Sequence, residues 1–313
     1  MPARRSFDTA DVDALVRRHD GVLTHAQLAA VGVPRSTVVR WAASGPWRRV
    51  LPGVVIAHRG VPTRRERRLA ALAYAGPQAV LSGHDALDVH SVLGNRIALP
   101  SEILVIIPDR EHRKPHGFVI VERSERDPGS VRRQGLPVTS VARASADAAR
   151  YSGTDENLVR ELFGAALQRG TCSVDELRDE VLHGPRQRSR TARKVLSEVW
   201  AGVRSAAEGR AYVLISSSPI DQPVWNEDVV INGVWIGQAD AYWPRLAVVL
   251  EIDGMRWHLG ALDMQRTLEK QRRYAAAGIL LVSIAPAEIM AEPEKFIRAI
   301  AETLDAARRR RAS

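Results

Sequence analysis

The chain has 313 residues, of which 45% are hydrophobic and 26% charged, a composition typical of a globular protein with room for two or three domains. The formal net charge of +9 favours a polyanionic partner, and the single cysteine, Cys172, excludes a disulfide framework and a cysteine-based zinc site. We find neither a signal peptide nor an apolar run long enough to cross a bilayer, so we expect a cytoplasmic protein without a membrane role, which makes nucleic acid the favoured polyanion.

Residues 1–60 carry the pattern of a winged helix-turn-helix domain. Thr24 and Gln27 form a capping box that predicts the start of a helix, and Pro34 suits the first turn of the next one. The dipeptide Pro52-Gly53 separates two short apolar runs, which predicts two strands joined by a tight turn. The inner side chains of the helix after Pro34 are expected to be Val38, Val39 and Trp41.

This pattern predicts a surface that binds double-stranded DNA. The second helix of a helix-turn-helix enters the major groove, and arginine and hydroxyl side chains at its start can bond to bases and phosphates. Arginines in the following hairpin suit contacts with the DNA backbone. The candidate contacts are Arg35, Ser36, Thr37, Arg40, Arg48 and Arg49. The alternative interpretation is a solvated basic face on a scaffold domain.

Residues 61–150 predict a middle α/β domain, and residues 151–204 predict a helical connector. Thr63 and Glu66 form another capping box, which opens a helix with several arginines in its first turns. Because cations oppose the helix dipole at this end, helix stability does not explain them. We therefore expect these arginines to follow a phosphate backbone. The two counted among the DNA-binding candidates are Arg64 and Arg65.

Several runs in the first half of the chain resemble the N-terminal winged helix of AbiEi-type antitoxins. They are Gly21 to Leu28, Pro52-Gly53-Val54, Pro62-Thr63 and Gly76 to Ser82. The resemblance implies an autorepressor or antitoxin of a type IV toxin–antitoxin system, with DNA and a cognate toxin as partners. A homodimer would suit a palindromic site. The chain departs from the family pattern at Gly83-His84-Asp85, where a Ser-His-Arg-Ser-like run is usual.

Residues 205–313 predict a separate α/β domain with the order helix, three strands, helix, strand, helix. Asn232-Gly233 is a strong signal for a hairpin between the first two strands. The nearly continuous apolar run from Leu246 to Leu250 predicts a central third strand. The predicted fold class is therefore a multidomain α/β protein.

Carboxylates in this last domain predict a metal site. Asp240 and Glu251 are expected at the ends of two neighbouring strands, where a short connection brings them together. Glu208, on the preceding helix, can add a third oxygen. Mg²⁺ takes such hard oxygen ligands, and it can activate water and stabilise charge on a phosphate.

The same region resembles the PD-(D/E)XK restriction-endonuclease-like superfamily, in particular its DUF559 and very-short-patch-repair endonuclease-like branch. The resemblance rests on Ala239-Asp240, the run from Val248 to His258, and the helix and strand that follow. It implies hydrolysis of DNA phosphodiesters with Mg²⁺ or Mn²⁺, and Asp240 and Glu251 as metal ligands. Asp253 then shares a face with Glu251, and His258 is a general base or a phosphate contact. Because Asp253 stands where the superfamily has its lysine, the positive group must come from elsewhere, with three candidates: Arg256, Lys270 and Arg272.

Three hypotheses for function remain open at this point. The first is a DNA-binding, metal-dependent endonuclease, and its alternative is an AbiEi-like repressor or antitoxin whose nuclease fold is catalytically inert. The third is a toxin-side or anti-phage effector. Asp240 alone could cap a turn and His258 could be structural, whereas Glu251 after a buried strand is costly unless it is paired or metal-bound.

Overall fold

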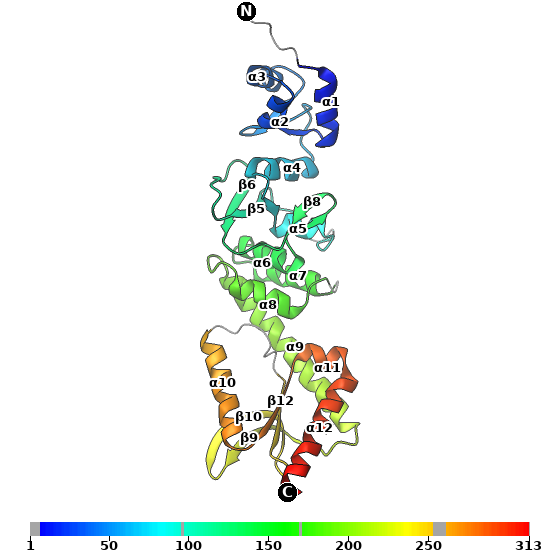
Figure 1. Cartoon of the computed structure of the whole chain (residues 1–313), viewed down its shortest axis with the longest axis vertical. Coiled ribbons are helices and arrows are strands. Elements are labelled where there is room, and N and C mark those ends of the chain that lie inside the picture. Colours follow the sequence, from blue (N-terminus) through cyan, green and yellow to red (C-terminus); the bar gives the residue numbers. More distant parts are fainter. Residues whose placement is uncertain (1–6, 95–96, 169–170, 253–260, 313) are drawn as a thin grey trace, which may run out of the picture. The chain divides into compact units, whose positions relative to one another are not determined.

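The structure, a computed structural model, describes residues 7–94, 97–168, 171–252 and 261–312 (Figure 1). The chain divides into two compact units, Met1–Ala192 and Arg193–Ser313. Among the described helices, none has the length and apolar character needed to span a lipid bilayer.

The first unit begins with a helix-turn-helix and a hairpin. Its elements are α1 (Thr9–Arg18), β1 (Val22–Thr24), α2 (His25–Ala30), α3 (Arg35–Ala43), β2 (Arg48–Leu51) and β3 (Val54–Ile56). The strands form an antiparallel sheet in the order β1-β3-β2. The predicted capping box is confirmed, since the amide of Gln27 donates to Oγ1 of Thr24 at 3.1 Å and the amide of Thr24 donates to Oε1 of Gln27 at 2.7 Å.

One apolar cluster holds these elements together. Leu23, Leu28, Val38 and Val55 are each almost fully buried within it. The prediction that Val39 also faces inward is wrong, because its side chain is 54% exposed. Successive residues turn about 100° around a helix, so the inner stripe of α3 runs from Val38 to the residues three and four positions later.

The middle of the first unit is a five-stranded sheet with helices. Its elements are α4 (Arg64–Ala75), β4 (Val80–Leu81), α5 (Gly83–Val89), β5 (Ile103–Pro108), β6 (Val119–Ser124), β7 (Val131–Arg133), β8 (Leu136–Val138) and α6 (Val141–Tyr151). The strand order is β6-β5-β4-β8-β7, with parallel pairs at β5–β6 and β4–β8. Two further helices, α7 (Glu156–Gln168) and α8 (Val174–His183), follow.

A buried carboxylate explains the arginines at the start of α4. Asp85 of α5 is 1% exposed, and it accepts hydrogen bonds from Nε of Arg64 at 2.8 Å and from Nε of Arg68 at 2.7 Å. Nη1 of Arg64 also donates to the carbonyl oxygen of Pro100 at 2.6 Å. For Arg64 and Arg68 the view that stability does not explain the cluster is therefore wrong, because both arginines pair with a buried carboxylate.

A second buried carboxylate joins α6 to the sheet. Asp147 is 1% exposed and accepts from Oγ of Ser82 at 2.7 Å, from Nε of Arg143 at 2.8 Å and from Nη1 of Arg150 at 2.9 Å. Arg150 also pairs with Glu122 on β6 at 2.9 Å. Several charge-assisted bonds thus compensate the burial of Asp147.

The second unit is a mixed sheet between helices. Its elements are α9 (Arg190–Ser216), which begins just before the unit boundary, β9 (Val224–Ile231), β10 (Val234–Trp243), β11 (Val248–Ile252), α10 (Ala261–Ala276), β12 (Leu280–Ile284), α11 (Pro286–Ala291) and α12 (Pro293–Ala312). The strand order is β12-β11-β10-β9, antiparallel except for the parallel pair β11–β12. Separate apolar clusters place α10 on one face and α9 with α12 on the other, as Figure 1 also shows. This element order agrees with the predicted one, with the short α11 added.

Replacing Asp85 with Asn tests the ion pairs around α4. The side chain keeps its shape, but Arg68 loses its buried counter-charge, so we expect the free energy of local opening at α4 and α5 to fall by about 3 kcal/mol. Amide hydrogen exchange on the full chain measures this. The matched control is Asp88→Asn, because Asp88 also pairs with Arg68 but its side chain is 37% exposed. That variant is expected to lose about 1 kcal/mol or less, and equal losses in the two variants would contradict the account.

Candidate nucleic-acid interface and acidic site

The start of α3 presents the predicted DNA contacts to solvent. Arg35, Ser36 and Arg40 are exposed, and Thr37 is half-buried. No acidic residue lies in the first turn of α3, so its positive helix end is not neutralised from within the helix. This surface has the chemistry needed to meet phosphates and base edges.

The wing adds Arg49 to the same surface. Arg49 on β2 is exposed, whereas Arg48 is half-buried and donates Nη1 to the carbonyl oxygen of Gly60 at 2.9 Å. Burial, and then the charges of Arg35 and Arg49, lower the pKa of His25 at the start of α2. His25 is therefore near both arginines, and as an uncharged ring at neutral pH it adds a hydrogen-bonding group to the basic surface that Arg35 and Arg49 form. Sequence reasoning missed His25 because it comes from a different element than either arginine.

The two candidates on α4 are placed differently from those on α3. Arg64 uses its guanidinium on Asp85 and Pro100, so the DNA surface proposed below leaves it out. Arg65 is exposed, and it donates to Oδ2 of Asp20 at 2.8 Å and to the carbonyl oxygen of Gln134 at 3.0 Å. Exposed pairs of this kind cost little to break, so Arg65 remains able to meet a phosphate.

The second unit brings the two predicted carboxylates together. β10 pairs with β11 through Ala241 and Leu250, and continuing this antiparallel register by one residue sets Asp240 opposite Glu251. Asp240 is 9% exposed and Glu251 is 8% exposed. The prediction that Asp240 ends its strand is wrong, because β10 continues to Trp243. A turn-capping role for Asp240 is thereby excluded.

Each carboxylate has identified hydrogen-bond donors. Asp240 accepts from the amide of Ile252 at 2.6 Å and from Nη2 of Arg204 at 3.1 Å. Glu251 accepts from Nζ of Lys270 at 2.7 Å and from the hydroxyl of Tyr274 at 3.0 Å. Of the three cations considered from sequence as the missing positive group, the structure places Lys270 on Glu251.

The compensation of charge at this pair is incomplete. Burial raises the pKa of Glu251, the charge of Asp240 raises it further, and Lys270 and Tyr274 only partly oppose the shift. Burial and the neighbouring carboxylates also raise the pKa of Tyr274, which stays a protonated donor. Each carboxylate thus faces one cation, Arg204 or Lys270, and the raised pKa of Glu251 indicates that its contacts do not fully make up for its burial.

A glycine lets α10 approach the carboxylates. A Cβ at Gly237 on β10 would lie 3.1 Å from the hydroxyl of Tyr274 and 3.3 Å from Cε of Lys270. Any side chain at this position would push against both residues. The absence of one leaves room for Lys270 and Tyr274 to reach Glu251 across the sheet.

The remaining predicted site residues are partly accounted for. Glu208 on α9 is half-buried, and its Oε1 accepts from Nε of Arg204 at 3.0 Å, so it is linked to Asp240 through that arginine. Asp253 and His258 lie outside the described residues. Sequence reasoning missed Arg204 and Tyr274, since each lies on a helix far along the chain from the strand residue that it contacts.

The acidic pair has the chemistry of a divalent-cation site with few protein ligands. Within residues 7–94, 97–168, 171–252 and 261–312, no group of three or more His, Cys, Asp or Glu side chains is placed to hold a metal ion. Mg²⁺ typically takes one or two carboxylates and completes its shell with water or substrate phosphate. Asp240 and Glu251 fit that donor set, and a divalent cation would supply positive charge to two carboxylates that lie side by side and buried.

Comparison with known proteins gives one family and two relatives. Residues 11–58 match a family model described as transcriptional regulator, AbiEi antitoxin. Two uncharacterized proteins of Mycobacterium tuberculosis, from strains CDC 1551 and H37Rv, are each 26% identical over 148 residues, which is 46% of this chain and 54% of each relative. The chain thus spans about half the length of these curated relatives. The family match covers the helix-turn-helix and hairpin described above.

Replacing Glu251 with Gln tests the incomplete compensation. Because the pKa of Glu251 is raised in the folded chain, its contribution to stability is present below the ordinary value of 4.5 and is lost as pH rises through the raised value. Gln cannot ionise, so we expect β10 and β11 to be more stable in the variant at pH 7 and nearly unchanged at pH 4. Amide hydrogen exchange on the full chain, at both pH values, measures the difference.

The matched control for this substitution is Glu269→Gln on α10, where the side chain is 63% exposed and pairs with Arg273. We expect it to leave β10 and β11 unaffected at both pH values. A Glu251→Gln variant less stable than the wild type at pH 7 would mean that Lys270 fully offsets the charge, and would contradict the account.

Proposed function

We propose that the protein is a DNA-binding transcriptional regulator of the antitoxin type, which contacts duplex DNA through α3 and the β2–β3 wing. The observation that carries this proposal is the match of residues 11–58 to a transcriptional regulator family, over the segment that presents Arg35, Arg49 and His25 on one surface. The net charge of +9 supports a polyanionic partner. The family description also makes a cognate toxin the protein partner of this proposal.

Charge removal from the basic surface tests duplex binding. We expect Arg35→Ala and Arg49→Ala each to weaken binding to a mixed-sequence duplex roughly fivefold, and to reduce the slope of log affinity against log salt by about 1 where a phosphate contact is lost. Fluorescence anisotropy at several salt concentrations measures both quantities. The control is Arg17→Ala, which removes an exposed arginine from α1. Equal binding by all four proteins would show that the α3 surface does not bind DNA.

A second candidate function is metal-assisted hydrolysis of phosphodiesters in the second unit. The observation that favours it is the meeting of Asp240, Glu251 and Lys270 at one point on the sheet. Asp240 and Glu251 would hold Mg²⁺ or Mn²⁺, which when bound supplies an activated water and positive charge beside the phosphate. If this function holds, the first unit brings the enzyme to duplex DNA. If it does not, the acidic pair belongs to an inert fold and the regulator proposal stands by itself.

The chain's own residues have separate roles in this candidate function. The amide of Ile252 fixes the orientation of Asp240, and Tyr274 fixes that of Glu251. Nζ of Lys270 is held at 2.7 Å from Glu251, so its positive charge lies beside the carboxylates where a phosphate would approach. The Arg204 guanidinium occupies Oδ1 of Asp240 and also binds Glu208, which places a second cation at the same edge.

Cleavage of plasmid and short duplex DNA tests this function. We expect nicking or cutting that requires Mg²⁺ or Mn²⁺ and stops with EDTA, and a loss on the order of a hundredfold in Asp240→Asn and Lys270→Met. Glu227→Gln on β9 is the control, since Glu227 is an exposed carboxylate on the same sheet. No cleavage by the wild type with either metal, while duplex binding is retained, would remove this function and leave the regulator proposal.

A further inference from the structure

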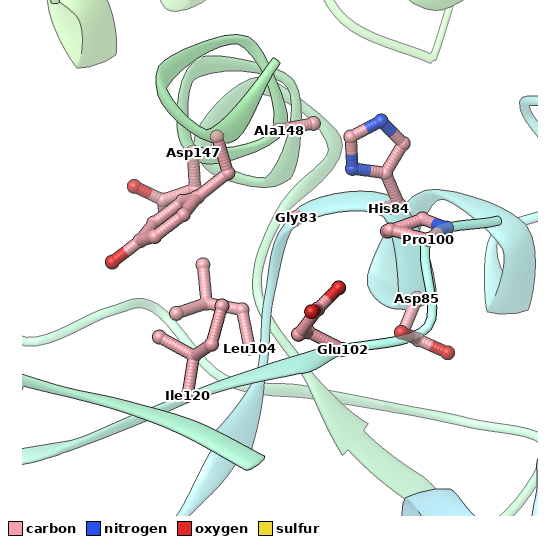
Figure 2. A pocket seen from close by; sticks show the side chains of 10 residues that line it. Gly83, His84, Asp85, Pro100, Glu102, Leu104, Ile120, Asp147 and Ala148 are labelled. Atoms are coloured by element: carbon pink, nitrogen blue, oxygen red, sulfur yellow. The ribbon is translucent and has the colours of Figure 1, made fainter. Parts of the chain in front are cut away.

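The first unit contains a cavity that shares no residue with either site described so far. Its volume is about 220 Å³. It opens between α5, the end of α6 and strands β5 and β6, and Figure 2 shows the side chains that line it. Neither the proposed DNA surface nor the acidic pair of the second unit includes any of these side chains.

The cavity wall includes a histidine with an unused hydrogen-bonding capacity. His84 is 8% exposed and lines the cavity, yet among the described residues neither of its ring nitrogens forms a hydrogen bond. Burial lowers the pKa of His84, so at neutral pH the ring is uncharged and offers one donor and one acceptor. The ring nitrogens of His84 are not among the fully buried atoms of the described residues that lack a partner, so they face the solvent of the cavity. A ligand in the cavity can take the place of that water as hydrogen-bond partner.

The cavity also has one carboxylate that the fold leaves available. Asp85 and Asp147 line the cavity, but both are engaged by arginines that do not line it. Glu102 is exposed. Among the described residues, the one hydrogen bond that its carboxylate accepts from another side chain comes from Oγ of Ser101 at 2.8 Å. That bond, followed by weaker effects including the charges of Arg67 and Arg64, lowers the pKa of Glu102, so it carries a negative charge at neutral pH.

The remaining lining is apolar apart from Tyr151, whose hydroxyl donates to Oε2 of Glu122 at 3.0 Å. Leu104 and Ile120 lie beside Glu102 in Figure 2, and Pro100 and Ala148 complete this part of the wall. No lysine or arginine is among the lining residues. The two arginines that hold Asp85 come from α4, so they fix the wall around His84 without filling the cavity.

We propose that this cavity binds a small organic cation that has an apolar body and an amidinium or ammonium end. The charged end pairs with Glu102 at the mouth and donates to the free ring nitrogen of His84, and the body packs on Leu104 and Ile120. An anionic ligand is disfavoured, because the carboxylate of Glu102 faces it. The nearby guanidinium groups of Arg64 and Arg67 do not line the cavity, since they donate to Asp85 and to carbonyl oxygens of Pro100 and Ser101. The walls are already held by buried ion pairs, so binding requires little reorganisation.

Titration of the full chain with benzamidine tests this site, with benzamide as the neutral analogue of the same shape. Backbone amide NMR shifts report the location, and we expect them to cluster at residues 83–85, 102–104 and 148–151. Benzamide should bind roughly fivefold more weakly, and Glu102→Gln should weaken benzamidine by a similar factor. Glu161→Gln is the matched control, because Glu161 is an exposed carboxylate on α7 away from the cavity.

A second variant separates the role of His84 from that of charge alone. His84→Leu removes both ring nitrogens at similar side-chain volume. It should weaken the binding of benzamidine and should not strengthen the binding of benzamide. If this variant does not fold, the comparison of Glu102→Gln with the wild type still tests the proposal. Absence of saturable shifts, shifts that map elsewhere, or equal binding of benzamidine by Glu102→Gln and the wild type would overturn the proposal. None of these outcomes depends on DNA binding or cleavage.

Discussion

Burial of carboxylates is the constraint that organises both units of this protein. Removing a carboxylate from water costs several kcal/mol unless cations or hydrogen-bond donors replace the lost solvation. In the first unit Asp85 and Asp147 are each met by two arginines, which ties α4, α5 and α6 around the central sheet. In the second unit Asp240 and Glu251 lie opposite each other with fewer positive groups around them, and the pKa of Glu251 is raised. The first arrangement holds the fold together, whereas the second leaves Glu251 with a raised pKa, and perturbed pKa values of this kind are typical of functional sites.

The pairing of arginines with buried carboxylates also explains which basic residues remain available to bind DNA. An arginine of α4 that the sequence suggests for DNA binding can instead form hydrogen bonds within the protein, as Arg64 does with Asp85 and Pro100. Arg35 and Arg49 are exposed, and they lower the pKa of His25 nearby, so the basic surface concentrates on α3 and the wing. The match to a regulator family covers the same segment. The exposed arginines of α3 and the wing therefore support the proposal that the first unit binds a polyanion.

Local sequence signals predicted most elements, and long-range pairing accounts for what they missed. The capping box at Thr24 and the hairpin at Asn232-Gly233 were predictable because the signals lie within a few residues, and both glycine-hairpin residues adopt the expected positive φ. Strand β7 could not be predicted, since its three side chains are exposed, two of them are arginines, and among the described strands it pairs only with the short strand β8. At the acidic site the two strand carboxylates were predictable from their apolar flanks. Lys270 was only one of three candidate cations until the packing of α10 over Gly237 placed it on Glu251.

The most direct test of whether the acidic pair is more than a structural ion cluster is a titration of the full chain with Mn²⁺ in the absence of DNA. The readout is the electron paramagnetic resonance signal of free Mn²⁺, which decreases when the ion binds. Because the buried carboxylates of Asp240 and Glu251 lie opposite each other, we expect a saturable site. The site should be lost in Asp240→Asn and kept in Asp228→Asn, which changes an exposed β9 aspartate of the same unit. Absence of saturable binding, or equal binding by both variants, would contradict the view that this pair is built to hold a cation.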